Sequence, residues 1–139
     1  MILRPSLPDK SGKIASLIRM PPPVRELLEE LSRSIAAHDL AASVALFTDD
    51  AIVAGTGEDE LGEGSTIPAF FEMTFGLGVS LTWTWQEPLV RREGDLAWYY
   101  VDGAMQIDGT KPRPYRSSGV LKRRADGWRF ALWHGAEPA

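Results

Sequence analysis

The chain has 139 residues, the usual size of one domain with its own hydrophobic core. It contains no cysteine, which excludes disulfides, iron–sulfur clusters, thiolate zinc sites and cysteine nucleophiles. Its formal net charge of −4 argues against nucleic acid as the main partner. The unusual feature is the presence of five tryptophans in so short a chain.

Residues 1–23 are expected to form an N-terminal arm, because prolines and a glycine interrupt every periodic pattern there. Residues 24–139 are expected to form a single domain. No run of about 18 apolar residues is present, so neither a membrane span nor a membrane partner is expected. The arm also lacks the continuous apolar stretch of a secretory signal, which favours a cytoplasmic protein.

Three helices are predicted in the first half of the chain. Apolar residues recur from Val24 to Ile35 with the spacing of one helical face, and acidic residues crowd the start of this segment. Asp39 is expected to cap a second, shorter helix, and Ser65 or Thr66 a third. The apolar face of the third helix would consist of Ile67, Phe70, Phe71 and Phe75.

The remaining segments show the alternation of strands. A short strand is predicted over 51–56, and four long antiparallel strands are predicted over 80–91, 96–107, 115–123 and 128–135. Turns that contain glycine separate these four strands. Helices followed by antiparallel strands indicate an α+β fold.

Three segments, in this order, carry a resemblance to a known family: HDLAASVALFTDDAIVAGTG (38–57), GDLAWYYVDGAM (94–105) and YRSSGVLKRRADGWRFALWHG (115–135). Together they resemble the SnoaL-like branch of the nuclear transport factor 2-like superfamily over about Val24 to Glu137. The resemblance implies a cone: a strongly bent antiparallel or mixed sheet packed on the three helices, open at one end as a pocket. It also implies a homodimer through the outer sheet face. It implies no single reaction, because isomerases, hydrolases, cyclases and association domains share this fold.

Two residues are weak candidates for a general base in such a pocket. His134 shares one face of the last strand with Trp128, Phe130 and Leu132, and this more apolar face is predicted to point inward. Asp102 shares a face with Trp98 and Tyr100, which is expected to be the outer one. Arg116 is expected to form a cross-strand or inter-subunit ion pair, for instance with Asp102.

The aromatic residues exceed what a simple core needs, so we expect them to be divided between a ligand pocket and a partner interface. Glycines in the middle of strands are expected to allow curvature of the sheet and to leave space for a cavity. The predicted pocket residues are Phe71, Trp83, Trp85, Tyr99, Gly103, Gly119 and His134.

No cofactor or metal site is predicted. The acidic segment with Glu58, Asp59, Glu60 and Glu63 lacks the spacing of a calcium loop and is interpreted as a solvated turn. His38 and His134 are too few and too far apart in sequence for a metal motif, and no phosphate-binding loop is present.

Three functional hypotheses follow. The first is a dimeric protein that binds a small apolar molecule. The second is an isomerase, cyclase or hydrolase that uses His134 or Asp102 as the base, and the third is an association module that only dimerises. The first is favoured, because no paired acid–base set is evident in the sequence.

Overall fold

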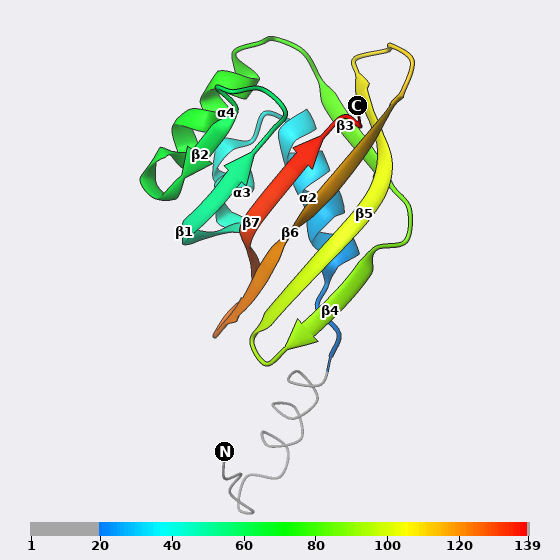
Figure 1. Ribbon diagram of the computed structural model, residues 1–139. Helices are drawn as coiled ribbons and strands as arrows, with labels where there is room; N and C mark the ends of the chain where they lie inside the picture. Colours follow the sequence, from blue (N-terminus) through cyan, green and yellow to red (C-terminus); the bar gives the residue numbers. More distant parts are fainter. Residues whose placement is uncertain (1–19, 139) are drawn as a thin grey trace, which may run out of the picture.

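The computed structural model describes residues 20–138 (Figure 1). Most of the predicted arm therefore lies outside the described residues. The helices are α2 (Val24–Ala36), α3 (Leu40–Ala45) and α4 (Ile67–Phe75), the last preceded by the 3-10 turn η1 (Gly64–Thr66). The strands are β1 (Phe47–Ala54), β2 (Leu61–Glu63), β3 (Leu81–Trp85), β4 (Leu89–Glu93), β5 (Leu96–Ile107), β6 (Arg113–Arg124) and β7 (Gly127–Ala136).

The strands of the described chain form one bent sheet in the order β2-β1-β7-β6-β5-β3, and β4 also pairs with β5. The β1–β7 pair is parallel and the other pairs are antiparallel, so the sheet is mixed. The predicted α+β class is confirmed, as is the bent sheet packed on helices.

Helix α2 crosses the concave face of the sheet (Figure 1). Its predicted apolar stripe is buried there, at Val24, Leu28, Leu31 and Ile35. The predicted cap of the second helix is also confirmed, because the Asp39 carboxylate accepts a hydrogen bond from the Ala42 N–H at 3.0 Å. The predicted strand over 51–56 begins earlier than expected, because the chain leaves α3 at Ala45 and enters β1 at Phe47.

The segment predicted as one strand over 80–91 is in fact two, β3 and β4, both paired with β5. Trp85 lies opposite Gly103 and Leu89 lies opposite Tyr100, so three residues of one side face two of the other. The extra residue lies in a stretch that ends with Pro88, which has no N–H to donate to the ladder.

A second irregularity corrects the prediction that His134 points inward. Leu121 pairs with Phe130 but Val120 pairs with Leu132, so Ala131 is an extra residue in β7. A bulge of this kind reverses the alternation beyond it. Phe130 is buried as predicted, whereas beyond the bulge Trp133 is buried and His134 is exposed.

The two mid-strand glycines permit close packing rather than leaving open space. A Cβ at Gly119 would lie 2.1 Å from the Leu132 carbonyl oxygen, and one at Gly103 would lie 2.2 Å from the Thr84 carbonyl oxygen. The ring of Tyr99 also occupies the space beside Gly119. These glycines therefore allow neighbouring strands and rings to approach where the sheet bends.

We predict that Gly119→Ala lowers the free energy of unfolding by about 1–3 kcal/mol, because the new methyl group would overlap a backbone carbonyl that cannot move alone. The control is Gly109→Ala, where nothing lies within 4 Å of the added Cβ. That change should stay within about 0.5 kcal/mol of the wild type. Urea unfolding measures both variants, and equal stabilities would contradict this account of Gly119.

Candidate functional site

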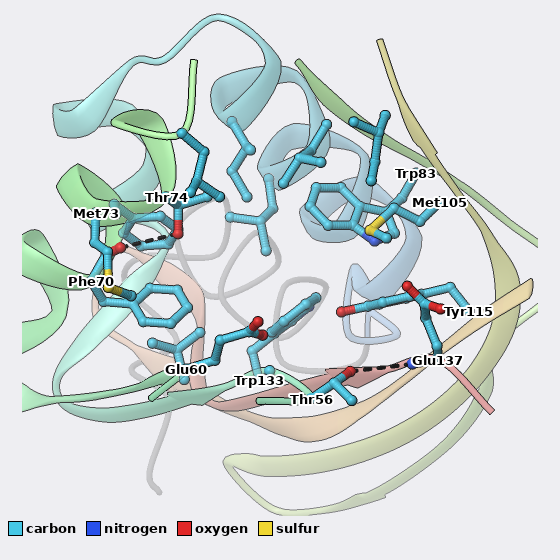
Figure 2. Close-up of a pocket in the computed structure, with 18 of the residues that line it drawn as sticks. Thr56, Glu60, Phe70, Met73, Thr74, Trp83, Met105, Tyr115, Trp133 and Glu137 are labelled. Atoms are coloured by element: carbon cyan, nitrogen blue, oxygen red, sulfur yellow. Dashed lines mark hydrogen bonds between the residues drawn. The ribbon is translucent and has the colours of Figure 1, made fainter. Parts of the chain in front are cut away.

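The concave side of the sheet encloses a cavity of about 470 Å³ (Figure 2). It lies between α2, α4 and β3 on one side and the inner faces of β1, β5, β6 and β7 on the other. Its wall is mainly apolar and includes Leu31, Ile35, Val53, Phe70, Phe71, Met73, Leu77, Leu81, Trp83, Met105, Ile107 and Trp133.

An aromatic cluster forms the part of this wall contributed by β3, β6 and β7. The ring of Trp83 lies 5.9 Å from that of Tyr115 and 6.3 Å from that of Trp133, centroid to centroid, the latter edge-on. On the α4 side, Phe71 packs between Phe47 and Phe75. The cavity wall thus continues directly into the hydrophobic core.

Tyr115 provides the polar group of the interior. Its side chain is 7% exposed, and its hydroxyl group points into the cavity (Figure 2). Within residues 20–138 this hydroxyl has no hydrogen-bond partner, unlike that of Tyr99. Burial, followed by the charges of Glu60 and Glu137, raises the pKa of Tyr115. The phenol therefore stays protonated at ordinary pH and can donate a hydrogen bond to a ligand.

Gly135 makes the position of Tyr115 possible. A Cβ at Gly135 would lie 2.6 Å from the Tyr115 hydroxyl oxygen and 2.4 Å from the ring of Trp133. Since no side chain occupies this point of β7, both rings can approach the strand there.

Charged groups surround the cavity beyond the aromatic wall. Arg113 and Glu137 form an ion pair at 3.1 Å, and the Glu137 N–H donates to the Thr56 hydroxyl at 3.3 Å. Asp59 and Glu60, from the turn between β1 and β2, border the same opening. Two of the residues interpreted as a solvated turn thus belong to the cavity.

Three indole N–H groups in the described chain, those of Trp83, Trp85 and Trp133, are buried without a hydrogen-bond partner. Each such group costs about 1–3 kcal/mol relative to a satisfied donor. Two of these residues wall the cavity. The unsatisfied donors of Trp83 and Trp133 therefore belong to side chains of the cavity wall.

Two of the seven predicted pocket residues border the cavity, and the other five do not. Phe71 and Trp83 border the cavity. Trp85 packs against Tyr115 without reaching the cavity, and Tyr99 is buried in the core, where its hydroxyl lies 2.9 Å from that of Ser117. The other three predicted residues, Gly103, Gly119 and His134, do not border it.

Both candidate bases lie on the outer face of the sheet. His134 is exposed, and the exposed Asp102 accepts a hydrogen bond from the Tyr100 hydroxyl at 2.7 Å. Arg116 lies directly opposite Asp102 in the β5–β6 register, but within residues 20–138 the two side chains form no ion pair. Neither side chain borders the cavity, so neither can act on a molecule bound there.

Sequence reasoning missed the polar residues that do border the cavity. Tyr115 alternates with the buried Ser117 and Leu121, so period-two reading of β6 could have placed it inside. No local signal identifies Asp59 and Glu60, because the direction of a turn relative to a distant helix depends on the whole sheet. The burial of Trp133 was not predicted, because the bulge at Ala131 reverses the alternation of β7 before this residue.

Between residues 20 and 138 no group of three or more histidine, aspartate or glutamate side chains is arranged to hold a metal ion. None of the helices of this region is both long and apolar enough to cross a membrane.

Comparison with known proteins identifies the family. The sequence model of the SnoaL-like domain family matches residues 24–139. The chain belongs to the SnoaL-like domain family. No curated protein matches it. Solved structures resemble this SnoaL-like domain in fold, at sequence identities that carry no information about activity.

Three of these structures illustrate the fold. An NTF2-like protein of unknown function from Pseudomonas putida KT2440 has 20% identity and a TM-score of 0.70, with 83% of this chain and 84% of that chain covered. An NTF2-like protein with a cystatin-like fold from Novosphingobium aromaticivorans has 18% identity and a TM-score of 0.72, with 99% and 92% covered. A nuclear transport factor 2 superfamily protein from Salmonella enterica has 21% identity and a TM-score of 0.71, with 84% and 89% covered.

We predict that Tyr99→Phe and Tyr115→Phe differ in their effects on the stability of this SnoaL-like domain. Tyr99→Phe breaks a buried hydrogen bond and should lower the free energy of unfolding by about 0.5–1.5 kcal/mol. Tyr115→Phe removes a hydroxyl that has no partner among the described residues, and should change stability by less than about 0.5 kcal/mol. Urea unfolding compares the two, and an equal loss in both would show that the Tyr115 hydroxyl is already bonded.

Proposed function

We propose that this SnoaL-like domain binds a small, largely apolar molecule in its cavity. The observation that carries the proposal is an apolar cavity of about 470 Å³ into which one buried phenol donor points. Sites for small organic ligands have this size and this composition, an apolar wall with a few oriented polar groups. A packed core of the same residues would have no such space.

The placement of the two candidate bases argues against catalysis by His134 or Asp102. An isomerase, cyclase or hydrolase needs a proton acceptor within hydrogen-bond reach of its substrate. His134 and Asp102 face away from the cavity, on the outer face of the sheet. The enzyme hypothesis built on these two residues therefore has no geometric support.

We further propose that the protein acts as a homodimer through this outer face. Ile52, Leu132, Val120 and Trp98 lie opposite one another on β1, β7, β6 and β5, and so form an apolar row across the sheet. Ile52 is 42% exposed and Trp98 is 45% exposed. Exposed apolar patches with aromatic residues are typical of protein interfaces.

The ligand proposal is tested with N-phenylnaphthylamine, an apolar dye whose fluorescence increases in apolar surroundings. We expect saturable binding to the wild type. Leu81→Trp replaces an aliphatic side chain of the cavity wall by a bulky indole. It should weaken binding of the dye by about tenfold or more, equivalent to about 1.4 kcal/mol.

The matched control is Leu61→Trp, the same exchange at an exposed strand position that does not border the cavity. It should bind the dye as the wild type does. Failure of the wild type to bind, or equal loss in both variants, would count against a ligand-binding cavity.

The dimer proposal is tested by sedimentation. Trp98→Glu places a charge in the apolar row, and burying it without a partner is unfavourable, so we expect a monomer. Thr110→Glu adds the same charge at the exposed β5–β6 turn and should remain dimeric. A monomeric wild type, or a Trp98→Glu variant that stays dimeric, would contradict the proposal.

A further inference from the structure

The charged groups at the cavity opening are unequal in sign. Three carboxylates, those of Asp59, Glu60 and Glu137, border the cavity together with a single guanidinium, that of Arg113. Arg113 is already paired with Glu137 at 3.1 Å. The opening therefore keeps an uncompensated negative charge, contributed by Asp59 and Glu60.

Glu60 is held in place by the backbone of its turn. The Gly55 N–H donates to the Glu60 carbonyl at 2.8 Å, and the Glu60 N–H donates to the Gly57 carbonyl at 3.1 Å. Its side chain lies over Gly55, where a Cβ would come within 1.9 Å of Oε2. Within residues 20–138 this carboxylate has neither an ion-pair partner nor a hydrogen-bond partner. The turn therefore holds the Glu60 carboxylate at the cavity, where it can pair with a cationic group of a ligand.

A second, independent observation comes from inside the cavity. Tyr115 is 7% exposed, its hydroxyl points into the space, and no described residue accepts its hydrogen bond. The Tyr115 hydroxyl borders the cavity and, unlike the indole N–H groups, is not closed off from it, so it can donate to an acceptor on a ligand. Figure 2 shows Glu60 and Tyr115 reaching the cavity from opposite sides. After burial, the negative charge of Glu60 is the next cause that raises the pKa of Tyr115, so the two groups lie close enough to interact.

We infer that the ligand is an apolar amine: its apolar body fills the cavity, a polar atom accepts from Tyr115, and a protonated amino group pairs with Glu60. This inference rests on the proposed ligand-binding function and specifies its chemistry. Carboxylate ligands would be repelled by Asp59 and Glu60, since Arg113, the one guanidinium among the described residues that borders the cavity, is paired with Glu137.

The test uses three molecules that share one ring system and one ether oxygen as acceptor: naphthyloxyethylamine, naphthyloxyethanol and naphthyloxyacetate. Each displaces N-phenylnaphthylamine, so the dissociation constants are directly comparable. We expect the amine to bind about threefold to fivefold more tightly than the alcohol, the range of a partly exposed ion pair, and the carboxylate to bind most weakly. Added salt should reduce the preference for the amine.

Glu60→Gln should remove the preference for the amine over the alcohol, both dissociation constants being measured against the dye in the same variant. Glu58→Gln removes the same charge from the same turn, at a residue that does not border the cavity, and should keep the preference. A wild type that binds the carboxylate as well as the amine, or a Glu60→Gln variant that retains the preference, would overturn the inference alone. A wild type that does not bind the dye would overturn the proposed function, and this inference with it.

Discussion

The contact between α2 and the exposed edge of β3 is the interaction on which the cavity depends. Strand β3 ends the sheet, so one row of its backbone groups has no neighbouring strand. The Ser32 hydroxyl accepts from the backbone N–H of Trp83 at 2.9 Å. The Arg25 guanidinium donates to the Gln86 carbonyl at 2.8 Å and pairs with Glu87. A helix thereby takes the place of the missing strand. This holds Trp83 over the concave face, where it completes the aromatic wall.

The cavity persists because its wall is rigid rather than because its residues are small. Trp83, Tyr115 and Trp133 are large rings that touch one another at their edges and faces. Rings with few rotatable bonds cannot collapse into an empty space as flexible side chains do. Gly135 contributes from below, since its lack of a side chain lets two of these rings lie against β7. The indole N–H groups of Trp83 and Trp133 have no partner in this wall, so the arrangement of these rings lowers the stability of the fold.

The fold was predictable from the sequence because its signals are local. The apolar stripe of α2, the Asp39 cap and the alternation along β5 and β6 each depend on residues a few positions apart. The candidate site was predictable only in part, at Phe71 and Trp83. Two insertions of one residue, near Pro88 and at Ala131, break the alternation, and they arise from how distant strands must fit a bent sheet. A turn that brings Asp59 and Glu60 to the opening is equally a property of the whole fold.

The positions of the tryptophans explain why the chain contains so many. Trp83 and Trp133 wall the cavity, Trp85 packs against Tyr115, and Trp98 lies exposed on the outer face. Trp128 lies under the Arg92 guanidinium, 5.2 Å from the ring centroid to the guanidinium carbon. A sheet with two apolar faces needs large rings on both, whereas a simple core needs them on one.

The bulge at Ala131 then decides which chemistry the inner face offers. Without it, the period of two that buries Phe130 would also bring Leu132 and His134 inside and turn Trp133 outward. An imidazole in an apolar cavity is a proton acceptor near neutral pH, whereas an indole is only a donor and a surface for packing. With Trp133 inside and His134 outside, the last strand presents an indole and no imidazole to the cavity.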